Sequence, residues 1–107
     1  MIYRNRRLLD LAHQVNECQF RLAPCQGYSP DGCEPAHSNH YEHGHGKGMK
    51  SSDAQHVAAC PSCHKHYDAH RLPRTLELQI FNEARQRTFE LYQHSGWLSK
   101  VGYKGEL

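Results

Sequence analysis

The stretch His56–His70, HVAACPSCHKHYDAH, holds two cysteines and four histidines in fifteen residues. Cys60 and Cys63 are separated by two residues, a spacing with which one tight turn brings two thiolates to the same zinc ion. A structural zinc ion takes four ligands, so a second pair must come from elsewhere in the chain. The partners of these two thiolates therefore decide the fold.

Three further cysteines are available for the second pair. We expect Cys18 and Cys25 to complete the site, although their six intervening residues exceed the usual two to four. Cys33 remains an alternative to either of them. A redox-active CxxC normally lies in a thioredoxin-like βαβ pattern, which this sequence lacks. Unliganded core cysteines are unusual beside so polar a run, so a zinc site is the favoured interpretation.

Length and composition agree with a domain that a metal ion stabilises. With 107 residues, of which 37% are hydrophobic, the chain has room for one domain with a modest core. A structural metal would add the stability that so small a core lacks. The net charge of +2 excludes a broad basic surface, although Arg4, Arg6 and Arg7 are crowded near the start. These arginines either touch phosphate or form a solvated helix end.

The sequence also bears on the compartment. No apolar run approaches the roughly 20 residues that cross a bilayer, so no membrane partner is expected. The N-terminal stretch MIYRNRRLLDLAHQ is only intermittently apolar and does not have the pattern of a secretion signal. We therefore expect a cytoplasmic protein whose five cysteines are thiols or metal ligands rather than disulfides.

Hydrophobic periodicity and turn-forming residues divide the single expected domain, residues 1–107, into four parts. Residues 4–16 form an N-terminal helix with Asn5 as its cap, and residues 18–71 form the zinc-binding core. Residues 73–95 form a longer C-terminal helix, and residues 96–107 are a tail that frays at its end. Within the core we expect extended pieces at Gln19–Leu22, Glu34–Ser38 and Val57–Ala59, then a helix from Pro61 to about Arg71.

The longer helix has an apolar stripe at helical spacing, which is most simply a core-packing face. Its end is marked by Ser95-Gly96, as expected of a C-terminal cap. The stripe consists of Leu76, Ile80, Phe81, Ala84, Thr88, Leu91 and Tyr92.

Eight of the ten histidines fall between residues 37 and 70, more than one zinc site can use. His64 and Asp68 are four residues apart and share one face of the expected helix. They either offer an imidazole and a carboxylate to a second, harder ion, or form an orienting or surface contact. His37 and His40 lie beside an expected strand, where an imidazole can act as general base for water near neutral pH.

The order of the motifs is also informative. The chain resembles the small HNH-type nuclease-like proteins of lambdoid phages and prophages, including the YbcO-like proteins, over about residues 8–70 and around Trp97. Any one motif is weak, whereas the set in this order is specific. The set is Cys18, Cys25, Ala36-His37, Gly46-Lys-Gly-Met-Lys50, Asp53, Cys60-x-x-Cys63-His64 and Asp68.

The resemblance implies an α+β fold, a small zinc-stapled ββα-metal (HNH or His-Me finger) core with an N-terminal helix and a longer C-terminal helix. It implies a metal-dependent endonuclease of phage or prophage type that hydrolyses DNA phosphodiester bonds in the cytoplasm of a bacterial host. The expected cofactors are a structural Zn²⁺ and a catalytic divalent ion such as Mg²⁺, Mn²⁺ or Ni²⁺. DNA is the expected partner, and a homodimer is compatible with the resemblance. The alternative is a non-catalytic zinc-binding module that binds nucleic acid or a partner protein.

The resemblance also implies roles for single residues. His37 is the general base, and His64, together with Asp68, binds the catalytic ion. Many HNH enzymes have a metal ligand at the position of Ala36, which is not a ligand. The other interpretation is therefore that His37 is itself a ligand of that ion and His40 is the base.

The remaining roles are assigned in the same way. The residue that positions the attacking water falls at Gln55 or His56, and Asp53 ligates or orients. Glycines in the segment before Asp53 would let the loop approach phosphate closely. We expect DNA contacts from the loop lysines and the N-terminal arginines, namely Lys47, Lys50, Arg4 and Arg7.

Overall fold

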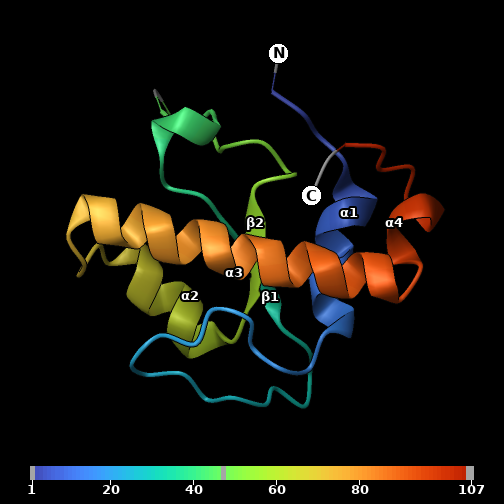
Figure 1. Ribbon diagram of the computed structural model, residues 1–107. Coiled ribbons are helices and arrows are strands. Elements are labelled where there is room, and N and C mark those ends of the chain that lie inside the picture. Colours follow the sequence, from blue (N-terminus) through green and yellow to red (C-terminus); the bar gives the residue numbers. More distant parts are fainter. Residues whose placement is uncertain (1, 47, 106–107) are drawn as a thin grey trace.

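An antiparallel hairpin followed by helices forms the centre of the protein (Figure 1), in a computed structural model that describes residues 2–46 and 48–105. The chain thus has the small α+β fold that the sequence predicts. In chain order the elements are α1 (Arg6–Asp10), the 3-10 turn η1 (Leu11–Gln14), β1 (Glu34–His37), the 3-10 turn η2 (Tyr41–His43), β2 (His56–Ala59), α2 (Pro61–Asp68), α3 (Arg74–His94) and α4 (Trp97–Lys100).

The hairpin pairs β1 with β2 so that His37 lies opposite His56 and Glu34 opposite Ala59. His37 is the last residue of β1 and opens into the connection 38–55, whereas Cys60 follows β2 at the other end of the hairpin. In Figure 1, α3 runs across the front of both strands, with α2 at one side and α1 and α4 at the other. The hairpin therefore places His37 at one end and the Cys60–Cys63 pair at the other.

The core has two clusters that meet at β2. Alternate residues of a strand point to opposite faces, so Val57 and Ala59 join the first cluster and Ala58 the second. This explains why all four residues of β2 are buried. The largest side chains are Phe20, Tyr67 and Phe81 in the first cluster and Leu8, Phe89 and Tyr92 in the second.

The helix α2 begins at the cysteine pair. Cys60 is its N-cap, with extended backbone and a sulfur that accepts a hydrogen bond from the backbone N–H of Cys63, and Pro61 occupies the first turn. We expected this helix to reach about Arg71, but it ends at Asp68. His70 has a left-handed φ of 53°, which cannot continue a helix.

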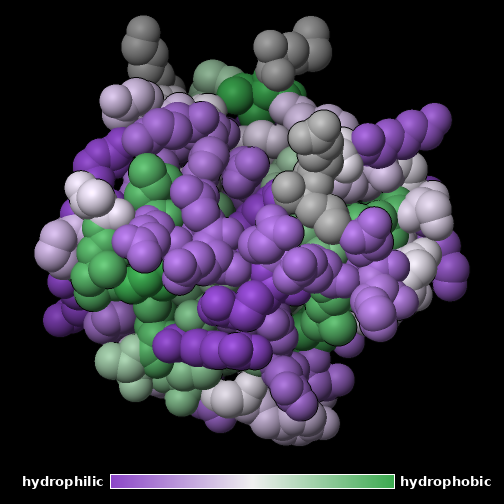
Figure 2. Space-filling model, viewed as in Figure 1, coloured by the Kyte–Doolittle hydropathy of each residue, from purple (hydrophilic) through white to green (hydrophobic). Residues whose placement is uncertain are grey.

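The bounds of α3 agree with the prediction, and Phe81, Ala84, Thr88 and Tyr92 of the predicted stripe are buried, but the stripe differs at other positions. Leu76 is 44% exposed, whereas Glu77 and Arg85 are buried. The reason is that both charged groups have partners inside: the Glu77 carboxylate lies 3.3 Å from His40 Nε2, and Arg85 Nε donates to the carbonyl of Ala54. Such pairing permits the burial of charge. In Figure 2 the outer face over α3 is mainly hydrophilic, with apolar side chains in small separate patches.

Three other local predictions need correction. The N-terminal helix is shorter than residues 4–16, because α1 passes into a 3-10 turn at Leu11, although Asn5 caps it as expected. Gln19–Leu22 forms no strand, since Arg21 has a left-handed φ of 60°. The expected tail 96–107 contains a helix, α4, and Leu98 and Val101 pack into the second cluster. The fraying predicted at its end stays untested, because residues 106–107 lie outside the described part.

Among the described residues, no helix has the length and apolar character needed to cross a membrane.

Candidate metal centre and adjoining cavity

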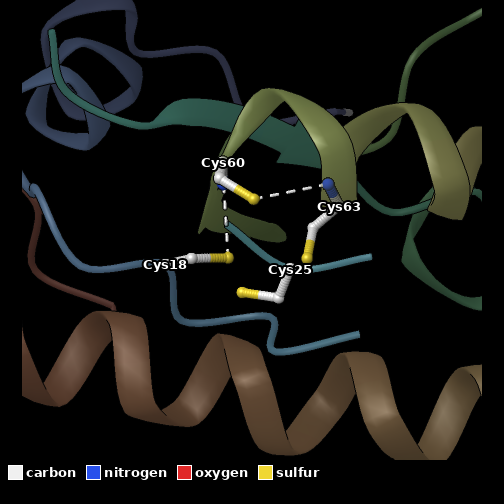
Figure 3. A group of neighbouring side chains, drawn as sticks. All are labelled: Cys18, Cys25, Cys60 and Cys63. Carbon is white, nitrogen blue, oxygen red and sulfur yellow. Dashed lines mark hydrogen bonds between the residues drawn. The ribbon is translucent and has the colours of Figure 1, made fainter. Parts of the chain in front are cut away.

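Four cysteines converge at the start of α2 (Figure 3). The sulfurs of Cys18, Cys25, Cys60 and Cys63 all lie within 4.8 Å of one another. Cys60 and Cys63 come from the beginning of α2, and the other two come from the loop that follows η1. The arrangement is consistent with a zinc-stapled ββα core.

The wide spacing of Cys18 and Cys25 is accommodated by a turn in the intervening loop. The backbone N–H of Cys25 donates to the carbonyl of Leu22 at 2.9 Å, and Arg21 adopts its left-handed conformation just before it. The loop thereby reverses direction and returns Cys25 to the side of Cys18. A turn of this kind removes the objection that six intervening residues are too many.

Backbone N–H groups surround the four sulfurs. Cys18 Sγ accepts from Cys60 N at 3.2 Å, and Cys25 Sγ accepts from Gly27 N at 3.3 Å. Cys60 Sγ accepts from two N–H groups and Cys63 Sγ from one, all at 3.4 Å. Hydrogen bonds of this kind favour the charged thiolate over the neutral thiol. The donors to the last two sulfurs are Gln26, Cys63 and Leu22.

The surroundings of the sulfurs shift the thiol pKa values in opposite directions. Burial raises the pKa of the thiols of Cys18 and Cys63. Burial acts in the same direction on Cys60, but the N–H donors of Gln26 and Cys63 outweigh it and lower the pKa of that thiol. All five cysteines are free, so no disulfide neutralises the group. Four gathered sulfur donors match the preference of Zn²⁺ for tetrahedral thiolate coordination.

Cys33 does not belong to this cluster. Its side chain is 1% exposed and packs in the second core cluster with residues such as Leu8 and Phe89. Burial raises the pKa of its thiol to about 12. The alternative in which Cys33 replaces Cys18 or Cys25 as a ligand is therefore wrong for this structure.

A cavity of about 420 Å³ lies beside α2, where the hairpin opens into its connection. Two elements supply its reactive groups: the end of β1 with the following residues, and one flank of α2. The polar residues that line it are His37, Ser38, Asn39, His45, Lys50, His64 and Asp68.

His37 enters the cavity in a defined orientation. Its Nε2 lies 2.9 Å from Asp53 Oδ1, and Asp53 Oδ2 accepts from the backbone N–H of Asn5 at 2.8 Å. Burial acts to raise the pKa of Asp53, but the hydrogen bonds from His37 and Asn5 outweigh it and hold that pKa below its usual value. An ionised carboxylate on Nε2–H leaves Nδ1 as the unprotonated nitrogen of a neutral imidazole.

His64 is flanked by two carboxylates. Its Nδ1 donates to Glu34 Oε1 at 2.8 Å, and its Nε2 lies 3.4 Å from Asp68 Oδ2. Asn39 Nδ2 donates to the other oxygen of Asp68 at 3.0 Å. A carboxylate on the far nitrogen is the usual support of a metal-binding histidine, and it leaves the Nε2 lone pair directed toward Asp68.

These two donor atoms fit one ion, since ligands about 2.1 Å from a metal centre can span 3.4 Å. They do not form a larger ligand group with His37: within residues 2–46 and 48–105, only the four cysteines bring three or more metal-binding side chains together. Water and substrate oxygens would have to complete such a site, as is common for Mg²⁺.

Two of the predicted catalytic histidines lie inside the protein instead. His40 is 1% exposed, with Nδ1 accepting from Arg74 at 3.1 Å. His56 is fully buried: its Nδ1 donates to the carbonyl of Asp53 at 2.7 Å, and its Nε2 accepts from the hydroxyl of Tyr92 at 2.9 Å. Burial lowers the pKa of both, that of His56 to about 4. Neither side chain lines the cavity, so their placement does not support the expected catalytic roles.

The residues expected to contact DNA lie in different parts of the protein. Lys50 lines the cavity, and Lys47 lies outside the described residues. Arg4 donates to the carbonyls of Lys50 and Ser51, and Arg7 donates to the carbonyl of Lys100 at 2.6 Å. These arginines tie chain segments together.

Sequence reasoning missed Glu34, Asn39 and His45. No local pattern marks them, because Glu34 meets His64 only when β1 lies beside α2, and Asn39 meets Asp68 only when the connection folds back. The one available signal was their position near His37, within the polar segment that follows Cys33.

Comparison of the chain with protein families, with curated proteins and with solved structures finds no match.

Proposed function

We propose that this protein is a metal-dependent endonuclease that hydrolyses phosphodiester bonds of DNA, and that its four-cysteine site holds a structural Zn²⁺. The observation that carries the proposal is the cavity in which a carboxylate-oriented His37 faces a His64–Asp68 pair on α2. A base and a pair of ion ligands in one cavity are the groups that metal-assisted hydrolysis requires.

In this proposal His37 acts as the general base. Its Nδ1 takes a proton from a water molecule as the water oxygen attacks phosphorus, and the bond to the leaving oxygen then breaks. The imidazolium that forms is stabilised by Asp53, whose carboxylate stays ionised because Asn5 and Arg4 also contact it. The proton leaves with the departing oxygen or returns to solvent.

The flank of α2 holds the other half of the site. His64 and Asp68 bind the catalytic divalent ion, which when bound supplies Lewis-acid stabilisation of the charge that develops on the phosphate and leaving oxygens. Glu34 orients the imidazole of His64, and Asn39 holds Asp68. Lys50 adds positive charge at the cavity wall for a phosphate.

The test is cleavage of duplex, single-stranded and branched DNA by the zinc-loaded chain with added Mg²⁺, Mn²⁺ or Ni²⁺. We expect His37→Ala to lower the rate by about 10²–10⁴-fold, the usual contribution of a general base. His94→Ala is the matched control, because His94 is exposed near the end of α3, away from the cavity. Zinc content and thermal unfolding should be the same in both variants. Absence of cleavage with every ion and every DNA form would reject the proposal.

A non-catalytic zinc module that binds nucleic acid is the second candidate. It is favoured by the one observation that four cysteines form a complete ligand set, whereas His64 and Asp68 are only two ligands. This candidate requires retention of DNA at low salt without turnover. It is rejected if the chain cleaves DNA and His37→Ala abolishes that cleavage while leaving DNA affinity unchanged.

A further inference from the structure

A second hollow, of about 280 Å³, lies along a different flank of α2. Basic and hydroxyl side chains make up its polar lining, and Pro24 and Ala69 supply its apolar walls. No acidic residue of the described chain contributes to it. The polar side chains are Ser62, Lys65, His66 and Arg71.

The basic side chains of this hollow have no partner among the described residues. Lys65, His66 and Arg71 make no side-chain hydrogen bond or ion pair with any other described residue. By contrast, Arg74 is bound to Glu42 at 2.6 Å, and Arg4 donates to backbone carbonyls. Positive groups that are gathered but unpaired are available for an anion from outside.

The hollow and the cavity lie on different sides of α2. At 100° per residue, the positions of Ser62, Lys65, His66 and Ala69 centre about 130° around the helix axis from those of His64 and Asp68. The helix α2 therefore separates the two hollows. A helix with side chains is about 10–12 Å across, so one DNA strand that passes over it can place different phosphates in the two hollows.

We infer that the Lys65–His66–Arg71 hollow binds a backbone phosphate of the DNA strand whose scissile phosphate occupies the cavity. This inference rests on the proposed function for the identity of the strand. The two hollows would hold different phosphates of the same strand, with the strand crossing α2. The hollow thereby sets the register of the strand and contributes affinity without reading sequence.

The test compares two double variants that remove the same charge. Lys65→Ala/Arg71→Ala empties the hollow of its two permanent cations. Lys100→Ala/Lys104→Ala is the control, since both lysines are exposed in and after α4, at the far side of the protein from α2 in Figure 1. Binding of a fluorescent single-stranded oligonucleotide is measured by anisotropy at several salt concentrations without divalent ions. Zinc content and circular dichroism check the fold of each variant.

We expect the first variant to lose about tenfold in affinity and to lower the slope of log K against log salt by about 0.7, the value for one phosphate contact on a single strand. The control should change affinity less than twofold. Equal effects of the two variants, in affinity and in slope, would overturn the inference.

The outcomes also separate this inference from the proposed nuclease activity. If the native chain cleaves DNA, the hollow variant should raise KM about tenfold with kcat unchanged. Cleavage with no loss of affinity in the hollow variant leaves the nuclease standing and removes the phosphate site. Specific loss of affinity in a chain that never cleaves keeps the phosphate site and removes the nuclease. A native chain that binds no DNA at low salt removes the phosphate site irrespective of catalysis.

Discussion

Asp53 Oδ1 lies 2.9 Å from His37 Nε2, and the same carboxylate receives the backbone N–H of Asn5 through its other oxygen. The carboxylate is 5% exposed and is thus held in place from the side of α1, away from the cavity. It orients the imidazole before any substrate arrives. In the proposed mechanism Asp53 is a positioning residue, because it acts through His37.

Asp53→Asn should lower kcat by about 10–100-fold, in line with losses of partners that orient functional histidines, while KM stays unchanged. Without the carboxylate the imidazolium is less stable, so the acidic limb of the pH–rate profile should move to lower pH. Steady-state kinetics across pH measure both effects. Asp10→Asn is the control, because Asp10 makes only an exposed ion pair with Arg6. An unaltered pH profile in Asp53→Asn would show that Asp53 has only a structural role.

Metal content separates the zinc ligands from the other buried cysteine. Native protein purified without a histidine tag should hold one zinc ion per chain by elemental analysis. Cys25→Ala should lose the ion and unfold at low temperature, because zinc binding contributes directly to the folding free energy of such domains. Cys33→Ala should keep the full zinc content, since Cys33 lies in the other core cluster. Loss of zinc in Cys33→Ala, or its retention in Cys25→Ala, contradicts the assignment of the site.

His56 should make stability depend on pH. Its pKa is about 4 in the folded protein, below its usual value of 6.5, because of burial. Between these values the unfolded chain binds a proton that the folded chain does not, so stability falls as the pH falls from about 6.5 to about 4. The full effect is on the order of 3 kcal/mol.

This dependence is measured by urea unfolding of the native chain and of His56→Gln at several pH values between 7.5 and 4.5. The glutamine variant should be less stable at pH 7.5, because a buried pair of hydrogen bonds is altered, but its stability should vary less with pH. Metal loss on acidification affects both chains and cancels in the comparison. Parallel stability curves would show that His56 does not titrate differently on folding.

Arg4 should matter for stability more than for DNA affinity. It donates to the carbonyls of Lys50 and Ser51 and contacts Asp53 at 3.3 Å, so it ties the N-terminal segment to the connection before β2. Arg4→Ala should lower the unfolding free energy by about 1–2 kcal/mol. Arg6→Ala should change it by less than about 0.5 kcal/mol, because Arg6 has only a surface ion pair. The slope of log K against log salt for DNA binding should be equal in the two variants. A smaller slope in Arg4→Ala would show that Arg4 contacts a DNA phosphate.

Much of the fold was predictable because local chemistry controls it. The Cys60–Cys63 spacing, the cap at Asn5 and the bounds of α3 follow from residues within a few positions of one another. The joint expectation of Cys18 and Cys25 was also correct as a grouping of sulfurs, although spacing alone could not exclude Cys33.

The candidate site was less predictable because it depends on contacts across the fold. The sequence analysis named His37, His40 and His56 as catalytic candidates, yet of these three only His37 lines the cavity, while packing against α3 encloses the other two. The inward face of α3 likewise depended on partners for Glu77 and Arg85 that no periodicity reveals.

The sequence by itself determined the cysteine spacing that suits a metal ion and the order of the elements, since residue type, spacing and capping act over short stretches of chain. Tertiary structure alone decided which histidine meets Asp53, that Glu34 supports His64, and that Cys33 stays outside the sulfur cluster. The physical reason is that burial and pairing depend on which segments pack together. The local spacing of residues does not show which distant segments those are.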